Sequence, residues 1–493
     1  MGWKQSYLIQ KSSTDAVKKA IDELLLEPPK PKHSQGVAQA PLNARSFGAI
    51  PDDGKDDTVA LRYLLGNCSK GGGEVFIPAG HYTVSPLTTK QGGPLPVPTV
   101  DILPVPSNCH VRGAGHSPLA MPNVTTIAMA TTGGADGKGV NGVDGCWWRM
   151  FGWCGNTSRC HETPSNITIT DLHLSGSTNY TEYAQVAGTR EHGSLVFFYA
   201  PDQTSVIKGI TVQRVFVEKV AGDGMDFGDG VQDLLVSDVL HRDCLRVGVD
   251  QAGYGPLSRN REVRHVYGFE PTPGVLQGNS IHIEEARNLT NVWIHDNVCN
   301  HSMDFGGVKD SRIENNIIYG QMLGNGNYNL TVVNNTIFQV DPHQPYSEYG
   351  SSPMLSQGFV QGANLSFNTF HSMAPFADAE AGIPTIIPVG ISVWGAVHDR
   401  FTAKDYYPTA TNIVIEGNRF LGNFSGPKWL HRQDHVSPQG LVSVRTINLN
   451  GVRGAQVLGN QFASGNVTDN LCECCTVVDQ PSAQRCVDVV AEV

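Results

Sequence analysis

Four short segments of the sequence share a pattern in which one ionisable residue lies between apolar residues. They are residues 224–228, 248–251, 280–283 and 302–306, and their ionisable residues are Asp226, Asp250, His282 and Asp304. In a β-strand neighbouring side chains point to opposite faces, so the apolar neighbours would enter a core and the ionisable residues would share the outer face. If the segments are strands of successive coils, about 4.8 Å apart, these four residues form one row. We call it the Asp–His row.

Three carboxylates and an imidazole in one row repel one another unless a cation compensates them. Arg246, Arg242 and Lys309 are near enough in the sequence to do so. A single outward Asp is most simply explained as polar surface, but four titratable groups in register favour a site. We therefore predict that the Asp–His row and Arg246 form the catalytic group.

Substrate-binding residues are expected in two further sets. Residues 252–277 form an insertion too long for a coil turn, and long loops in compact domains are commonly functional. We expect this loop to overhang the row with an arginine-rich wall. Aromatic side chains that stack on sugar rings form the second set, and Trp293 alternates in an apolar strand, so it can face either way. The predicted substrate-binding residues are Arg259, Arg261, Arg264, Lys309, Trp148 and Trp394.

An internal repeat indicates the architecture that positions these residues. The pattern apolar-x-apolar-x-x-Asn recurs with its last residue at Asn297, Asn316, Asn335, Asn368, Asn418 and Asn460. Earlier coils carry Leu172, Val215 and Val239 at the same place. Stacked asparagines can bond to one another and to turn amides, which explains their fixed offset from two apolar positions. A repeat of this kind predicts a solenoid of parallel β-coils.

The segment that precedes the repeat adds a family resemblance. An acidic stretch at residues 52–57 leads into an apolar helix at 59–65, and Gly71-Gly72-Gly73 then opens a strand that ends near Tyr82. This segment resembles the entry of the pectate-lyase-like and polygalacturonase-like right-handed parallel β-helix superfamily of carbohydrate-active enzymes. The resemblance implies an all-β, single-domain right-handed parallel β-helix with an N-terminal capping helix. It also implies a substrate groove on the outside of one parallel sheet.

The resulting domain prediction has three parts. Residues 1–42 form an N-terminal helical arm and linker, residues 43–465 the catalytic β-helix, and residues 466–493 a Cys-rich tail.

Neither of two families, polygalacturonases and alginate C5-epimerases, has its complete set of catalytic residues in this sequence. The motif set of polygalacturonases is absent, and Arg312-Ile313-Glu314 breaks the Arg-Ile-Lys element. Alginate C5-epimerase modules carry Asp-Pro-His-Glu, of which only the first residue matches at Asp226. Residues 341–344 are closer to that motif but lie in a different coil context.

Three functions remain open. Glycoside hydrolysis needs two carboxyl groups, for which Asp226 with Asp250, or Asp250 with Asp304, would serve. A polysaccharide lyase or C5-epimerase needs a base such as His282 or Arg246, and positive charge on the uronate from the three predicted arginines or from Ca²⁺ on the row. A non-catalytic glycan-binding or structural β-helix is the third. The three carboxylates favour hydrolysis, and no cofactor is expected except Ca²⁺ for a lyase.

Composition restricts the partners. The 493 residues carry a net charge of −11, with 16% charged and 40% hydrophobic residues and with 54 Gly and 29 Pro. This balance excludes a disordered chain, argues against nucleic acid as a partner, and leaves no uncharged apolar run long enough to cross a membrane. A polysaccharide or oligosaccharide is the expected partner, and a homo-oligomer is compatible with the sequence.

Cysteines and glycosylation sequons predict the compartment. The chain has 11 Cys, of which Cys472, Cys474, Cys475 and Cys486 cluster near the end, and Asn-x-Ser/Thr sequons are several-fold more frequent than chance. Disulfides explain the cluster more simply than zinc does. The combination predicts a secreted, extracellular, disulfide-bonded glycoprotein, although residues 1–10 lack the apolar run of a signal peptide.

Overall fold

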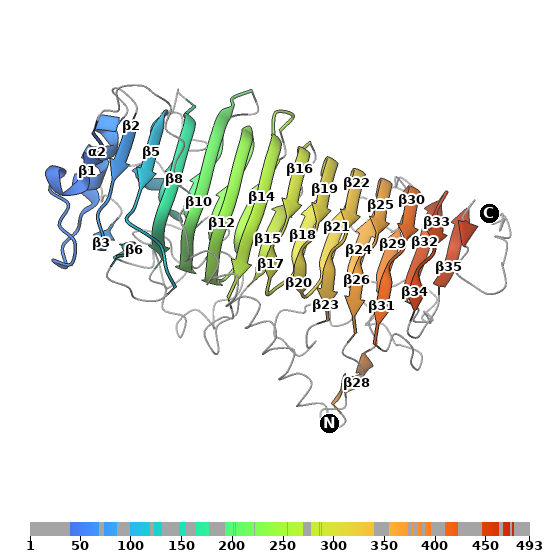
Figure 1. Ribbon diagram of the computed structural model, residues 1–493. Coiled ribbons are helices and arrows are strands. Elements are labelled where there is room, and N and C mark those ends of the chain that lie inside the picture. Colours follow the sequence, from blue (N-terminus) through green and yellow to red (C-terminus); the bar gives the residue numbers. More distant parts are fainter. Residues whose placement is uncertain are drawn as a thin grey trace.

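The fold is a right-handed parallel β-helix, seen in a computed structural model of the chain (Figure 1). The structure describes residues 40–68, 73–85, 99–118, 123–130, 147–153, 163–176, 193–200, 202, 204–220, 222–253, 255–269, 278–284, 286, 288–339, 354–372, 376–378, 383–386, 390–395, 410–422, 446–462, 467–473 and 476–477. In the main sheet system every strand pairs in parallel with the equivalent strand of the next coil. The architecture expected from the repeat is confirmed.

Sheet 1 is the sheet that carries the Asp–His row. Its strands are β4 (Thr99–Pro104), β7 (Trp147–Trp153), β9 (Ser194–Phe198), β11 (Asp223–Phe227), β13 (Val247–Ala252), β15 (Asn279–Glu284), β18 (Met303–Gly306), β21 (Met322–Asn325), β24 (Leu355–Gly358), β29 (Ile391–Trp394), β32 (Ile447–Arg453) and β35 (Val467–Glu473).

Sheet 2 follows the turn after each strand of sheet 1. It contains β1 (Leu42–Asn43), β2 (Gly73–Phe76), β5 (Cys109–Arg112), β8 (Ser165–Ser175), β10 (Ile207–Val220), β12 (Val231–Cys244), β14 (Arg259–Gly268), β16 (Thr290–His295), β19 (Lys309–Glu314), β22 (Tyr328–Val333), β25 (Gln361–Ser366), β30 (Ala410–Glu416), β33 (Gln456–Leu458) and β36 (Thr476–Val477).

Sheet 3 closes each coil. It contains β3 (Gly80–Val84), β6 (Thr125–Met129), the last residues of β8, β10, β12 and β14, and then β17 (Val298–Cys299), β20 (Ile317–Tyr319), β23 (Thr336–Phe338), β26 (Thr369–His371), β31 (Arg419–Leu421) and β34 (Gln461–Phe462). A separate antiparallel pair, β27 (Phe376–Asp378) and β28 (Ile383–Ile386), lies outside the coils.

The asparagine ladder lies at the turn between sheets 2 and 3. Each Asn side chain donates to the carboxamide oxygen of the next, from Asn297 through Asn316, Asn335, Asn368 and Asn418 to Asn460, at 2.8–3.1 Å. The same oxygen also accepts the backbone N–H of the preceding coil. All six residues are buried. The predicted ladder is confirmed, and it satisfies backbone groups that the turn would otherwise leave unpaired.

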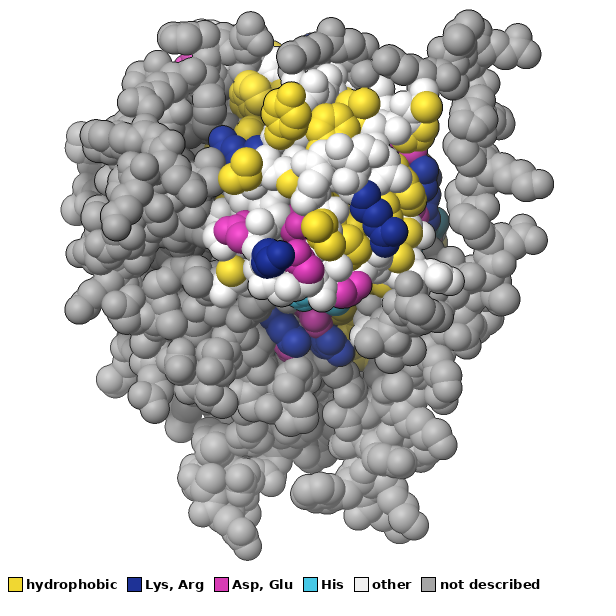
Figure 2. Space-filling model, turned by 90° about the vertical axis from the view of Figure 1, so that its left-hand side faces the viewer, with side chains coloured by type: hydrophobic (Ala, Val, Ile, Leu, Met, Phe, Trp, Pro, Cys, Tyr) yellow, Lys and Arg dark blue, Asp and Glu magenta, His cyan; other side chains and the backbone are white. Residues whose placement is uncertain are grey.

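The helix predicted at residues 59–65 is present as α2 (Thr58–Cys68), after a short 3-10 helix η1 (Ala44–Phe47). The Asp56 carboxylate accepts the Thr58 N–H at 2.8 Å, which caps the helix N-terminus. Leu61, Leu64 and Leu65 are buried, and Arg62 donates to two carbonyls of β4. Figure 2 looks onto this end of the molecule, where hydrophobic and charged side chains lie side by side.

Two expectations about boundaries are wrong. Residues 259–268 are not part of an overhanging loop, because they form strand β14, which pairs with β12 and β16 in sheet 2. Buried and less buried positions alternate around Arg261 and Val263 and again around Val266 and Gly268, a strand pattern that the prolines and glycines around it concealed. The β-helix also continues past residue 465, since β35 and β36 pair with β32 and β33.

Other expectations concern residues outside the described part of the chain. These are the N-terminal arm and the cysteines Cys146, Cys154, Cys160, Cys474, Cys475 and Cys486. Within the described residues Cys68, Cys109, Cys244 and Cys299 are buried free thiols, so none of them supports the predicted disulfides. The described helices include none that is long and apolar enough to span a membrane.

The ladder gives a stability prediction. Replacing Asn335 by Leu removes its bonds to Asn316, Asn368 and the Ile313 carbonyl and leaves their buried partners unsatisfied. We expect the free energy of unfolding to fall by about 3 kcal/mol. Urea denaturation followed by circular dichroism measures it. The exposed Asn364→Leu on β25 is the matched control, and an equal loss in both variants would contradict the role given to the ladder.

Candidate active site

The Asp–His row exists as predicted. Asp226 of β11 is the register partner of Asp250 on β13, Asp250 of His282 on β15, and His282 of Asp304 on β18. The flanking residues Met225, Phe227, Val249, Ile281, Ile283, Met303 and Phe305 are all buried in the core. The row therefore lies on the outer face of sheet 1, and it is fixed by the apolar residues on either side.

Arg246 supplies the expected cation from the turn between β12 and β13. Its Nη1 lies 2.9 Å from Asp223 Oδ2 and 3.0 Å from Asp250 Oδ2, and its Nη2 lies 2.6 Å from Glu284 Oε2. The charges of Asp223 and Asp250 outweigh the effect of burial and raise the pKa of Arg246. A guanidinium so held stays protonated, so it acts as a fixed positive charge rather than as the base.

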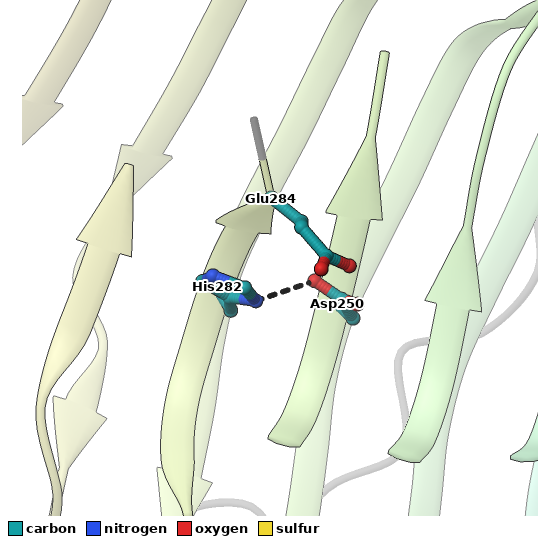
Figure 3. Close-up of side chains that lie close together, drawn as sticks. All are labelled: Asp250, His282 and Glu284. Carbon is teal, nitrogen blue, oxygen red and sulfur yellow. Dashed lines mark ion pairs between the residues drawn. The ribbon is translucent and has the colours of Figure 1, made fainter. Parts of the chain in front are cut away.

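His282 and Asp250 form a directed pair. Figure 3 shows both side chains with Glu284, and the His282 Nδ1 lies 3.0 Å from Asp250 Oδ1. Burial by itself would lower the pKa of His282, but its contact with Asp250 and the nearby Asp304 raise that pKa overall. Burial likewise opposes ionisation of Asp250, yet His282 and Arg246 hold the pKa of Asp250 below its ordinary value. Asp250 is thus the ionised partner of the imidazole, at ion-pair distance from Nδ1 but outside hydrogen-bond geometry.

Asp226 has the opposite protonation behaviour. The residue is 1% exposed, and burial together with the charge of Asp250 raises its pKa well above the ordinary value. Tyr199 hydrogen-bonds to Asp226, and burial raises the pKa of that phenol too. Gly228 makes room for this tyrosine, since a Cβ there would lie 1.9 Å from the Tyr199 ring. The pair is a neutral proton donor beside an ionised Asp250.

A second cation lies on the earlier coils of sheet 1. Arg149 of β7 is 5% exposed, and its guanidinium carbon lies 2.9 Å from the centre of the Phe197 ring. Burial lowers the pKa of Arg149 to about 10, although Asp101 and Asp226 oppose the shift. Its Nε and Nη1 have no hydrogen-bond partner among the described residues. A buried guanidinium with two unused donors is suited to an anionic group of a ligand.

The predicted substrate-binding arginines do not join this cluster. Arg261 is buried and donates to the Phe227, Gly228 and Val231 carbonyls, so it braces the turn that follows Asp226. Arg264 forms an ion pair with Glu262 in sheet 2, and Arg259 is exposed at the start of β14. Lys309 opens β19 in the same sheet and contacts Asn288. The assignment of the three arginines to a groove wall is wrong because β14 belongs to sheet 2, as does β19 with Lys309.

The two predicted tryptophans both lie on sheet 1. Trp148 of β7 is paired with Val100 of β4, and the side chain of Trp148 lies outside the described part. Trp394 of β29 donates from Nε1 to Ser356 Oγ at 3.2 Å, and its ring covers Gly358 of the preceding coil. Since Trp394 lies on the same sheet, three coils beyond Asp304, its role as an aromatic subsite stays a prediction.

Four contributors were missed at the sequence level: Asp223, Glu284, Tyr199 and Arg149. A signal existed for Glu284, which lies two residues after His282 and therefore on the same face of β15. Tyr199 and Arg149 had no comparable signal, because the row positions of the β9 and β7 coils are Phe197 and Gly152.

Two sets of donor atoms lie close enough to hold a cation. The atoms of Asp223, Asp226 and Asp250 form one set, and those of Asp250, His282 and Glu284 form the other, each within 4.8 Å. The all-oxygen set has the chemistry that Ca²⁺ prefers. However, Arg246 already contacts two of its three carboxylates and supplies positive charge there.

Comparison with known proteins gives partial matches. No family model matches the chain. It is 29% identical over 202 residues to the mannuronan C5-epimerase AlgE1 of Azotobacter vinelandii, which is 41% of this chain and 12% of that protein. It is 25% identical over 202 residues to the mannuronan C5-epimerase AlgE4 of the same organism, and the match covers 41% of this chain and 30% of that protein. The chain thus spans less than a third of the length of these relatives.

Solved structures support the fold. The A-module of Azotobacter vinelandii AlgE6 has a TM-score of 0.51 at 18% identity, with 89% of this chain and all of that chain covered. A DFA-IIIase from Arthrobacter chlorophenolicus A6 has a TM-score of 0.54 at 12% identity, with 87% of this chain and 98% of that chain covered. Both likenesses show the β-helix fold and nothing more specific.

Arg246 gives the second prediction. Replacing it by Met leaves Asp223 and Asp250 without their cation, and we expect a loss of about 3 kcal/mol or more in unfolding free energy at neutral pH. The deficit should shrink as the pH falls, because protonation removes the uncompensated charges. Thermal denaturation across pH measures both effects. Arg264→Met, which breaks a partly exposed ion pair with Glu262, should cost under about 1 kcal/mol.

Proposed function

We propose that the protein is a carbohydrate-active enzyme, a C5-epimerase of a uronic-acid polysaccharide. One observation carries this: an imidazole in ion-pair contact with an ionised carboxylate shares one row with a neutral acid, and one guanidinium contacts that carboxylate while a second lies near the neutral acid. The similarity to mannuronan C5-epimerases supports the substrate class. Mannuronan is accordingly the first substrate to test.

The reaction begins with removal of the proton from C5, which is acidic only when the neighbouring carboxylate is neutralised. Arg149 is suited to this task because its buried Nε and Nη1 are unused within the described residues. The electron pair of the C5–H bond then moves into the carboxylate as an enediolate, which the guanidinium stabilises. His282 is the base, since the ionised Asp250 lies 3.0 Å from its Nδ1 and stabilises the imidazolium that forms.

Reprotonation at C5 from the opposite face completes the epimerisation. Tyr199, whose raised pKa keeps the phenol protonated, is the donor, and Asp226 holds it. Asp226, which holds the donor, and His282 are two coils apart, roughly 10 Å, so the donor and the base come from different coils. If the 4-linked oxygen departs before reprotonation, the same residues perform β-elimination, so a lyase is the second candidate.

Glycoside hydrolysis, which the sequence favoured, is supported less well by the geometry of the site than epimerisation is. Both carboxyl pairs that could serve include Asp250, which is already bound to His282 and Arg246. The base of a hydrolase must instead contact water or the sugar. We also propose that Arg246 makes Ca²⁺ unnecessary at the row, so that chelation by EDTA leaves turnover unchanged.

Three readouts on one substrate separate the reactions. Incubation with polymannuronate in D₂O should place deuterium at C5 and convert mannuronate to its epimer, as followed by ¹H NMR. A lyase would instead produce unsaturated ends that absorb in the ultraviolet, and a hydrolase would produce only new reducing ends. His282→Gln should lower the rate by at least about 100-fold. His265→Gln, on sheet 2, is the matched control and should keep full activity.

The pH dependence tests the His282–Asp250 pair. The base must be neutral and its pKa is raised, so the rate should increase as the pH rises through a value above the ordinary 6.5 of histidine. Asp250→Asn removes the charge that stabilises the imidazolium, so this limb should move to lower pH while the maximal rate falls. If the acidic limb of the pH–rate profile stays at the same pH in Asp250→Asn as in the parent, His282 is not the titrating base.

A further inference from the structure

The most exposed large hydrophobic side chains of the described part form two groups. Ile50, Val59 and Tyr63 lie at the N-terminal end, whereas Trp293, Tyr328 and Phe367 are all aromatic and belong to sheet 2 or the turn that follows it. The second group is remote from the Asp–His row, which lies on sheet 1. Its concentration on one sheet needs an explanation other than core packing.

Trp293 is the centre of this group. It points outward from β16 between Glu262 of β14 and Arg312 of β19, its register partners. The indole Nε1 donates to Glu314 Oε1 at 2.8 Å. One ring face is stacked on His295, with ring centres 3.8 Å apart, while 41% of the residue remains exposed. The indole is therefore held rigidly with part of its surface open.

Charged groups, not apolar ones, surround the indole. His295 lies between Glu262 and Asp296, at 3.3 and 2.6 Å. Arg312 forms an ion pair with Glu314, and its side chain remains 52% exposed. A protein partner would require a contiguous apolar patch, which this rim interrupts. A rigid aromatic face bordered by carboxylates and a guanidinium instead suits a pyranose, whose C–H face stacks on the ring while its hydroxyls bond to the rim.

The other two aromatics extend the surface along the solenoid. Tyr328 opens β22, two coils beyond β16, and Phe367 follows β25, three coils beyond it. Phe367 is 56% exposed, and its ring packs over Gly417 of the next coil. The outward positions between them, Thr331 and Asn364, carry hydrogen-bonding side chains. An extended chain is thus a better fit than a single sugar.

We propose that Trp293, Tyr328 and Phe367 form a polysaccharide-binding surface on sheet 2, separate from the active site on sheet 1. It takes an extended chain of pyranose units and holds polymer against the enzyme without entering the reaction. Its substrate class rests on the proposed function, but its residues do not overlap with those of the catalytic cluster.

Affinity electrophoresis through gels containing polymannuronate, or a neutral β-glucan, tests the surface. The His282→Gln background prevents turnover during the run. Trp293→Ala should weaken retardation by polymannuronate about tenfold, and Trp293→Tyr, which keeps an aromatic ring, should retain most of it. Retardation by the β-glucan alone would contradict the proposed polymer. Tyr63→Ala is the control, since it removes an aromatic that is more exposed than Trp293, at 64% against 41%, from the other group.

The outcomes separate this surface from the proposed function. With an active enzyme, Trp293→Ala should lower turnover of long polymer and leave turnover of short oligosaccharides unchanged. Absence of retardation in the parent, equal retardation in Trp293→Ala, or an equal loss in Tyr63→Ala would overturn the proposal.

A melting temperature equal to that of the parent shows that Trp293→Ala is folded, and Arg312→Ala at the rim serves as the second variant if it is not. Loss of turnover in His282→Gln with unchanged polymer binding bears only on the catalytic assignment.

Discussion

The constant register between successive coils is the constraint on which the rest of this molecule depends. Because each strand pairs in parallel with the next, a residue type repeated at one coil position becomes a continuous line along the solenoid. On the inside this gives the buried asparagine ladder from Asn297 to Asn460. On the outside of sheet 1 the same rule brings Asp226, Asp250, His282 and Asp304 into one row. A single geometric rule thus creates both a stabilising feature and a chemically strained one.

The strain is electrostatic, and it is resolved unequally along the row. Arg246 and His282 stabilise the ionised form of Asp250, whereas Asp226 is left in a buried position where its neutral form is favoured. Neighbouring carboxyl groups whose pKa values are driven apart are the usual arrangement of an acid next to a base. This asymmetry is the basis of the acid and base roles proposed for the row.

The arginines show how strongly the meaning of a residue depends on its sheet. Arg261 follows Arg246 by only 15 positions in the sequence, yet it is buried as a brace for carbonyls behind β11, whereas Arg246 is the cation of the row. Arg149 precedes the row by two coils and still reaches Asp226 electrostatically. Distance along the chain is therefore a poor guide, because one coil returns the chain to almost the same place.

The sequence alone determined the architecture, the ladder and the register of the row. Each depends on periodicity, which is a local property: an apolar residue on either side of Asp250 or His282 is sufficient to fix which face these residues occupy. The tertiary structure alone decided which cations reach that row, that residues 259–268 form a strand instead of a loop, and that Trp293 faces outward. Those outcomes depend on side chains from different coils and sheets meeting in space, and no spacing within one strand encodes them.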